Sequence, residues 1–409
     1  MRILNFGSCN IDFAYSVDHI VVPGETTGTY NLEVFCGGKG LNQSIAAAKA
    51  GAEVYHAGCI GNDGEMLRDV LTENGVDVSN LKTMDVKNGH AIIQINKNGE
   101  NSILLYSGSN AMVTKEFIDE VLQKFCEDDL LLLQNEISNV HYLIKKAYEK
   151  GIKIVLNPAP FDESLKEIDF NMLSYVILNE VEAKAFTGTE EPEKIIQYMK
   201  KRYPKLKTVL TLGKSGCIYA DGEQTLYHPS FQVKTVDTTA AGDTFIGFFL
   251  SAVTKEQSYA QAIRFASAAS ALSVSKKGAA PSIPLENEVI KALETLKPRS
   301  MGTTERLREE INIFLDKNIK SARLGDLAKE LNYSENYAGE LIKRIMGKTF
   351  SEILHEKRCM CAAKLLRETE IPIEEIIENV GYQNKSFFRK KFEKMYNKTP
   401  YNYRKTKQQ

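Results

Sequence analysis

The hydrophobic pattern divides the chain into two parts. Up to about residue 290, short apolar runs rich in β-branched residues alternate with stretches whose apolar residues recur at helical spacing. The apolar runs read RILNFGS, VYHAGCIG, LLLLQNEI, KIVLNPAP, YVILNE and TVLTLG, and helical stretches such as VHYLIKKAYEKG and PEKIIQYMKKRYP lie between them. This alternation predicts an α/β domain in which helices cover both faces of a parallel sheet.

One segment, residues 88–110, departs from that alternation. Its sequence HAIIQINKNGENSILLY contains two runs of alternating apolar and polar residues around Asn98-Gly99. An Asn-Gly pair between such runs favours a tight turn, so the segment predicts a β-hairpin. A hairpin inserted into an α/β domain is expected to serve as a lid.

The pattern changes again near residue 298. Pro298, Ser300 and Gly302 indicate a linker, and from Arg306 onward helical periodicity dominates with almost no strand signal. We therefore expect a first domain over residues 1–297, a linker over 298–304 and an all-α domain over 305–409.

The all-α domain contains one plan twice. Residues 324–347 predict a short helix, a turn at Asn332-Tyr333, an N-cap at Ser334 and a second helix. Residues 373–397 repeat this plan with Gly381 at the turn. Both segments are typical of helix-turn-helix units, and FSEILHEKRCMCAAKLLRET between them predicts one continuous helix.

Composition narrows the class of protein. Of the 409 residues, 43% are hydrophobic and 26% charged, which is ordinary for a soluble globular protein. No run approaches the ~18 apolar residues of a membrane span, and the N-terminus lacks the pattern of a signal peptide. The seven cysteines are scattered, as expected for reduced thiols. These features predict a cytoplasmic protein that does not associate with membranes.

The net charge of −1 conceals an asymmetry. Residues 299–409 hold 23 basic and 16 acidic side chains, whereas residues 1–298 hold 29 basic and 37 acidic ones. In the second helix-turn-helix unit the basic residues alternate with Phe387, Phe388 and Phe392. We expect the cations to face DNA phosphates and the aromatic rings to pack inward. A small helical bundle with a solvated basic face would give the same pattern.

The segment DTTAAGDTF, residues 237–245, carries the clearest chemistry. A glycine where a helix begins lets backbone N–H groups surround an anion, and the helix dipole adds positive potential there. Asp243, in that first turn, could accept a proton from a substrate hydroxyl, which suits phosphoryl transfer. The same residue could instead only stabilise the helix dipole.

Two earlier segments supply polar groups at comparable places. GSCNID puts Asn10 and Asp12 just after the first strand, and CGGKGLNQS puts Asn42 just after a glycine turn. Ligand groups lie at such positions in open α/β sheets. A turn followed by a helix cap is the alternative for each segment.

Taken together, these segments resemble the ribokinase family of sugar kinases over residues 1–295. The matching pieces are GSCNID, PGET, GGKGLNQ, LLLQNE, NEVE, TLGKSG, DTTAAGDTF and KKGAAPSIP, in that order. The resemblance implies a ribokinase-like fold with a β lid and ATP-dependent phosphorylation of a sugar, with ribose as the leading substrate. It implies that Asp243 is the base and that Ala240, Ala241 and Gly242 form the anion hole. Sugar hydroxyls would be held by Asn10, Asp12, Gly38, Lys39, Gly40, Asn42 and Glu136, beside Asp243.

The same resemblance implies the nucleotide and cation sites. ATP would contact Asn179, Thr211, Leu212, Gly213, Lys214, Ser215, Gly216, Gly242, Asp243 and Ser267; the family commonly has Asn or His near Ser267. Mg²⁺ would be held through water by the Asn179 and Glu182 pair, as suits an ion that sheds water reluctantly. K⁺ would bind beside the anion hole at Asp237, Thr239, Ser273, Gly278 and Ser282.

Residues 305–405 resemble the DNA-binding domain of AraC-type transcription regulators, chiefly through GYQNKSFFRKKFEKMYNKTPYNYR at their end. The resemblance implies contacts to double-stranded DNA from Asn336, Lys343, Arg344, Asn384, Lys385, Arg389 and Lys390. Two residues depart from the family pattern. Ile377 replaces a usual small Ala, which could loosen helix packing, and Asn397 replaces a usual Gly, although Asn tolerates a left-handed backbone.

The sequence therefore leaves two alternative functions for this chain. The first is an active sugar kinase that also binds DNA as a regulator, and the second is a sugar-sensing regulator with a catalytically weak kinase fold. A third arrangement merely joins two independent activities. Relatives often pair through the lid, so a homodimer is expected to suit operator binding.

Overall fold

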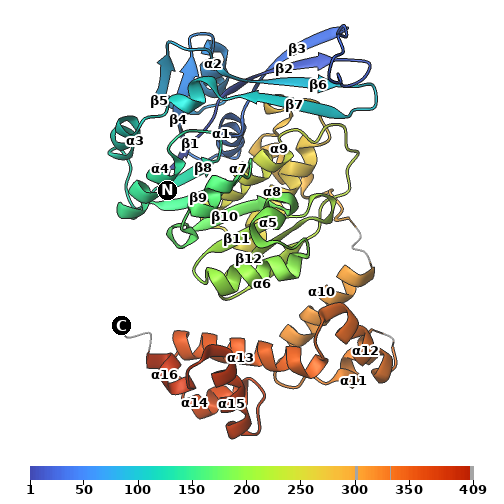
Figure 1. Ribbon diagram of the computed structural model, residues 1–409. Coiled ribbons are helices and arrows are strands. Elements are labelled where there is room, and N and C mark those ends of the chain that lie inside the picture. The colour runs from blue at the N-terminus through green and yellow to red at the C-terminus, as the bar shows by residue number, and fades with distance from the viewer. Residues whose placement is uncertain (300–302, 332, 406–409) are drawn as a thin grey trace. The chain divides into compact units, whose positions relative to one another are not determined.

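The computed structural model describes residues 1–299, 303–331 and 333–405. The chain forms two compact units, Met1–Arg299 and Ser300–Gln409 (Figure 1). Ser300 and Gly302 of the expected linker and Asn332 of the first expected turn lie outside the described residues.

The first unit is built on a nine-stranded sheet with the order β13-β12-β11-β10-β9-β8-β1-β4-β5. The six strands expected from the sequence are present and parallel, which confirms the α/β prediction. Antiparallel β12 and β13 at one edge and parallel β5 at the other were not anticipated. The strands are β1 Ile3–Phe6, β4 Val54–Gly61, β5 Asp77–Met84, β8 Leu130–Gln134, β9 Lys153–Asn157, β10 Tyr175–Asn179, β11 Lys207–Thr211, β12 Cys217–Ala220 and β13 Thr225–His228.

Helices cover both faces of this sheet, and each face has its own core. In β8, Leu130 and Leu132 join one core while Leu131 and Leu133 join the other, because successive side chains of a strand point to opposite faces. The first core contains residues of α1 Lys39–Lys49, α2 Glu65–Glu73, α7 Ala241–Thr254, α8 Tyr259–Ser273 and α9 Glu286–Ala292. The second contains residues of α3 Lys115–Leu122, α4 Val140–Glu149, α5 Glu180–Thr187 and α6 Pro192–Arg202.

Helices α1 and α7 pack unusually close together. A Cβ added at Gly247 of α7 would lie 2.4 Å from Cβ of Ala46 in α1. Glycine is therefore required there for contact, and this contact brings the first turns of the two helices to the same place.

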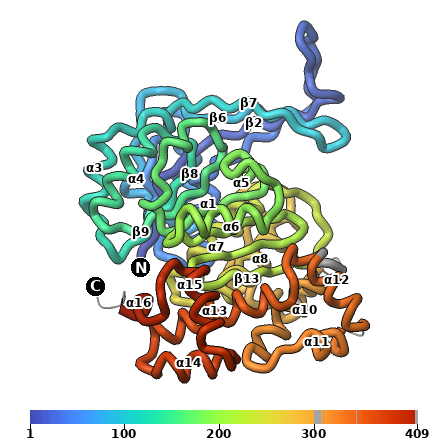
Figure 2. Tube along the Cα trace, turned by 60° about the horizontal axis from the view of Figure 1, so that its bottom comes forward, coloured from blue at the N-terminus to red at the C-terminus, as the bar shows by residue number. Residues whose placement is uncertain are grey.

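A second, four-stranded sheet with the order β3-β2-β6-β7 forms the lid. The hairpin predicted around Asn98-Gly99 is confirmed, with Gly99 at a φ of 80°. The lid is wider than predicted, because the two strands that follow β1 also belong to it; β2, β6 and β7 run side by side in Figure 2. Its strands are β2 Asn10–Ser16, β3 Asn31–Gly37, β6 Gly89–Ile95 and β7 Asn101–Tyr106.

The second unit is all α, and one long helix contributes to the core on each side of it. As predicted, α13 is continuous, and Ser334 caps α12 by accepting a hydrogen bond from the Tyr337 N–H. Ile377 lies fully buried in the second core, so the helices accommodate its larger side chain, and Asn397 adopts the left-handed conformation at a φ of 52°. The helices are α10 Thr303–Lys317, α11 Leu324–Glu330, α12 Glu335–Met346, α13 Phe350–Glu368, α14 Ile373–Asn379, α15 Lys385–Tyr396 and α16 Pro400–Lys405.

Among the described residues, none of the helices combines the length and apolar character that a membrane span needs.

Candidate active site and nucleic-acid interface

The predicted sugar-binding residues gather where β1, β2 and α1 meet. Asn10 and Asp12 lie on β2 of the lid, and the Oδ1 atom of Asn10 accepts a hydrogen bond of 2.7 Å from the Nδ2 of Asn110. The carboxylate of Asp12 lies against Gly37, where an added Cβ would be 2.0 Å from its Oδ2. Gly38, at a φ of 93°, turns the chain into α1, whose first turn holds Lys39, Gly40 and Asn42.

Glu136, which follows β8, ties this cluster together. It accepts hydrogen bonds from the Ser8 hydroxyl and, at 3.1 Å, from the backbone N–H of Lys39. The Nζ of Lys39 lies 3.7 Å from its other oxygen. Lys39 is thus held among acidic groups at the centre of the cluster.

Asp243 reaches the same cluster from α7. Its Oδ1 accepts a hydrogen bond of 2.9 Å from Nε2 of Gln43, and its Oδ2 accepts one of 3.2 Å from Nδ2 of Asn42. Asn42 is only 5% exposed, yet its Oδ1 has no hydrogen-bond partner. A buried acceptor left free beside a carboxylate is suited to a ligand hydroxyl, because such a group otherwise costs free energy.

The predicted anion hole lies at the start of α7. Ala240 adopts the left-handed conformation, with a φ of 57°. This conformation costs a non-glycine residue about 1 kcal/mol and is typical of functional sites. The first backbone N–H groups of a helix have no partner within it, and a Cβ added at Gly242 would meet nothing within 4 Å. Open space therefore adjoins donors that an anion can use.

Two carboxyl groups of the cluster, those of Asp12 and Asp243, have raised pKa values. Burial, together with the charge of Glu136, raises the pKa of Asp12 to about 7. Burial also raises the pKa of Asp243, against the opposing effects of Lys39, Gln43 and Asn42. Burial lowers the pKa of Lys39, but Glu136 and Asp243 outweigh it and the net pKa is raised. The cluster thus places acidic side chains around one lysine.

The predicted nucleotide residues lie at the ends of neighbouring strands. Asn179 ends β10 and caps α5, and both carboxylate oxygens of Glu182 accept hydrogen bonds of 2.9 Å from it. Thr211 ends β11, and the loop of Leu212, Gly213, Lys214, Ser215 and Gly216 leads into β12. Ser267 of α8 approaches this loop through a 3.6 Å contact of its Oγ with Sγ of Cys217. The pairing of β10 with β11 brings Asn179 and Thr211 together at the carboxyl-terminal ends of these strands.

The residues predicted to bind potassium form two groups, and the members of each group are hydrogen-bonded to one another. Asp237 accepts hydrogen bonds from the N–H of Thr239 at 2.9 Å and from that of Gly278 at 2.9 Å. Burial opposes these bonds, yet they lower the pKa of Asp237. Ser273 and Ser282 are buried and share a hydrogen bond of 2.8 Å. Among the described residues, no three His, Cys, Asp or Glu side chains cluster as a metal site would require.

In the second unit, the predicted DNA-binding residues lie on α12 and at the start of α15. Asn336 and Lys343 lie on α12, and the side chain of Arg344 falls outside the described part. Asn384 caps α15 by accepting from the N–H of Phe387 at 2.9 Å, and Lys390 lies two turns further on.

Two features of α15 differ from expectation. Phe388 and Phe392 are buried as predicted, but the prediction that Phe387 packs inward is wrong, because its ring is 41% exposed and contacts His355 and Lys391. Lys385 and Arg389 are not free cations, since each lies 2.7 Å from the carboxylate of Glu374 in α14. The helical spacing of the basic residues in the sequence gives no indication that Glu374 pairs with them.

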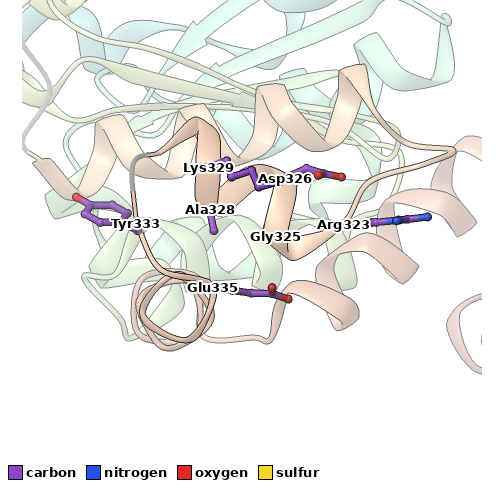
Figure 3. Close-up of a pocket in the computed structure, with 7 residues that line it drawn as sticks. All are labelled: Arg323, Gly325, Asp326, Ala328, Lys329, Tyr333 and Glu335. Carbon is purple, nitrogen blue, oxygen red and sulfur yellow. The ribbon is translucent and has the colours of Figure 1, made fainter.

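A pocket of about 300 Å³ lies on the first helix-turn-helix unit (Figure 3). Its lining includes Arg323 and Lys329 but also Asp326 and Glu335, so it offers both signs of charge. This mixed lining does not suit a site for a phosphate anion.

Sequence reasoning did not assign roles to three side chains that hold the cluster in place. Gln43, Asn110 and Asn157 are buried and hydrogen-bonded to the predicted site residues or to each other. The sequence could have drawn attention to Gln43, because it is a polar amide close to the apolar residues Ile45, Ala46 and Ala47 in the same helical segment.

Both parts of the chain are similar to known protein families. Residues 2–286 match the pfkB family of carbohydrate kinases. The chain belongs to that family. As a pfkB-family carbohydrate kinase it is a sugar kinase, and residues 327–406 match a helix-turn-helix domain, which supports DNA binding by the second unit.

Relatives of this pfkB-family chain include two bacterial ribokinases. The ribokinase of Haemophilus influenzae is 37% identical over 297 residues, which cover 70% of this chain and 97% of the relative. That of Bacillus subtilis is 35% identical over 293 residues, which cover 70% of this chain and 98% of the relative. Among solved structures, the ribokinase of Thermotoga maritima has a TM-score of 0.65 at 33% identity, covering 72% of this chain and 99% of that chain. A ribokinase of Arabidopsis thaliana, solved with ribose and ATP, has a TM-score of 0.64 at 28% identity, covering 72% and 98%.

The open space at Gly242 yields a first prediction. Gly242→Ala should leave the melting temperature unchanged or slightly raised, because Ala is the better helix former and nothing obstructs its Cβ. It should nevertheless lower kcat/KM by about 10²-fold, since the methyl group would displace the reacting group. Calorimetry and steady-state kinetics measure the two effects.

Gly247→Ala in the same helix is the matched control. Its Cβ would overlap Ala46, so it should cost about 1–3 kcal/mol of stability. Unchanged activity in Gly242→Ala would show that no ligand uses the space beside that residue.

The raised pKa of Asp12 yields a second prediction. An ionised carboxylate accepts sugar hydroxyls at both oxygens, whereas protonation turns one oxygen into a donor, and with a pKa of about 7 Asp12 must lose a proton to present both acceptors at lower pH. KM for the sugar should therefore rise as pH falls below about 7, approaching tenfold per pH unit. Asp12→Asn should bind more weakly, with a KM that no longer depends on pH in this range. A wild-type KM that stays level from about pH 5.5 to 8.5 would contradict the assignment.

Proposed function

We propose that this chain transfers the γ-phosphoryl group of ATP to D-ribose, giving ribose 5-phosphate, and that its second unit makes it a DNA-binding transcription regulator. The observation that carries the kinase proposal is the position of Asp243, held by two side-chain amides beside the open first turn of α7. The ribokinases among its relatives, and the solved complex of one with ribose and ATP, support the choice of substrates.

The residues of the cluster would take different parts in the reaction. Asn10, Asp12, Asn42 and Glu136 would hold the sugar hydroxyls, as would the backbone of Gly38, Lys39 and Gly40. Asp243 would take the proton of the hydroxyl that is phosphorylated. The sugar oxygen then bonds to the γ-phosphorus while the bond from that phosphorus to the bridging oxygen breaks, and ADP leaves. Backbone N–H groups at Ala240 to Gly242 would stabilise the charge on the transferred group.

The activity assay described below can also identify a sugar other than ribose as the substrate. A deoxyribokinase of Salmonella typhi is 29% identical over 300 residues, so 2-deoxyribose belongs in any panel.

The nucleotide would lie against Asn179, the loop from Thr211 to Gly216, and Ser267. Glu182 fits a hydrated Mg²⁺, because a carboxylate offers about four acceptor positions and its two bonds to Asn179 leave others for metal-bound water. Mg²⁺ would supply positive charge to the phosphates.

The oxygen-rich groups formed by Asp237, Thr239, Ser273, Gly278 and Ser282 fit K⁺, a hard cation that binds oxygen ligands. There the ion would supply positive charge beside the anion hole.

The lid supports pairing of two copies. Every residue of β7 is exposed, including Ile103, Leu104, Leu105 and Tyr106, and Leu32 and Val34 of β3 are exposed as well. A sheet with such an apolar surface at its edge is typical of an interaction site. A homodimer formed there would present two copies of the DNA-binding unit.

The kinase proposal is tested by ADP release from the full chain with ATP, MgCl₂ and KCl. The panel contains ribose, 2-deoxyribose, other pentoses, fructose and nucleosides, with the phosphorylated product identified by mass. Turnover should be fastest with ribose, and Asp243→Asn should lower kcat by about 10²- to 10⁴-fold because it removes the base.

Other results of this assay would relocate the base or distinguish a sugar sensor from a kinase. Full activity in Asp243→Asn would place the base elsewhere. Absence of turnover across the panel, with ribose binding still measured by calorimetry, would establish a sugar sensor instead of a kinase.

The DNA proposal is tested through the salt dependence of binding. Lys390→Ala should weaken binding to a random-sequence duplex and reduce the slope of log K against log salt by about one, since it removes one phosphate contact. Lys201→Ala, which removes an exposed cation from α6 in the kinase unit, is the control. An unchanged slope in Lys390→Ala would exclude this face of α15 from the DNA contact.

A further inference from the structure

We infer that Gln43 is a positioning residue for the phosphoryl-transfer reaction: it holds Oδ1 of Asp243 and so leaves Oδ2 to take the proton of the sugar hydroxyl. This inference rests on the proposed function, in which Asp243 is the base. It adds a residue whose side chain contacts Asp243, Asn157 and Gln134.

The contacts of Gln43 use all of its amide group. Its Nε2 donates to Oδ1 of Asp243 at 2.9 Å and to Oδ1 of Asn157 at 3.1 Å. Its Oε1 accepts from Nε2 of Gln134 at 2.7 Å. The residue is fully buried on α1, so water cannot replace any of these partners.

The orientation of the Gln43 amide is set by groups that cannot reverse. Asn157 donates its Nδ2 to the backbone carbonyl of Ile177 at 3.0 Å, so its Oδ1 faces Gln43. Gln134 also donates to Asn5, whose own Nδ2 donates to the carbonyl of Gly40 at 2.7 Å. Because backbone carbonyls only accept, both ends of this buried network have a fixed direction.

That direction has a chemical consequence for Asp243. The network can present only an N–H to Oδ1, which favours the ionised carboxylate that a base requires. Gln43 accordingly acts against burial and lowers the pKa of Asp243. The other oxygen receives only the longer bond from Asn42, at 3.2 Å, and is the one available to a substrate hydroxyl.

Two variants test the inference in the full chain. Gln43→Glu keeps the shape but replaces a donor with an acid, and Gln43→Met keeps the volume without a polar group. In both, the acidic limb of kcat at saturating ribose should move to higher pH by about one unit, because Asp243 is harder to ionise. The value of kcat at neutral pH should fall by about tenfold or more, with KM for ribose changed less than about threefold.

Ser44→Ala is the structural control. Ser44 is equally buried and accepts from Asn5, but it does not contact Asp243. It should lower the melting temperature without moving the acidic limb. An unmoved limb in both Gln43 variants would overturn the inference, as would an equal movement in Ser44→Ala.

A second measurement needs no turnover. With carboxyl-¹³C aspartate in the full chain, the Asp243 resonance is identified by its loss in Asp243→Asn and titrated directly. Its pKa should be higher in Gln43→Glu and Gln43→Met than in the wild type, and equal values would overturn the inference. Failure of the wild type to phosphorylate any sugar would refute the proposed function, while this titration would still decide the role of Gln43.

Discussion

The candidate active site depends on the close contact between α1 and α7. Asn42 and Gln43 lie some two hundred positions from Asp243 in the sequence, and they meet it because two helices approach through Gly247 and Ala46. Side chains of ordinary size would separate the helices by several ångströms, and hydrogen bonds of 2.9 Å and 3.2 Å would be lost. Glycine and alanine in this contact are therefore requirements of the chemistry as much as of the core.

Much of this could be predicted from the sequence, for identifiable reasons. Parallel strands give continuous apolar runs, and glycine-containing turns after them indicate where polar groups gather, so the approach of Asn42 to Asp243 could be expected in advance. The helix-turn-helix units were readable because a cap such as Ser334 and a glycine such as Gly381 leave local signals.

What could not be predicted depends on contacts between distant segments. Glu374 of α14 pairs with Lys385 and Arg389 of α15. Only the packing of these two helices reveals that the cations have a partner. Helical spacing placed three phenylalanines on a core face, yet the ring of Phe387 lies at its rim. The strands β2 and β3 were missed because neither is buried along its whole length, so that neither shows a full apolar run.

The leucines of β8 have a consequence for how the sheet is aligned. Since leucine faces both cores, sliding this strand by one position would still bury leucine on each side, and the apolar pattern alone would not penalise the error. The polar residues at the strand ends would penalise it: Gln134 is paired with Asn157 in the adjacent strand, and it donates to Asn5 of β1. A slip would bury these amides without partners. The network that orients Asp243 thus also selects the register of the central strands.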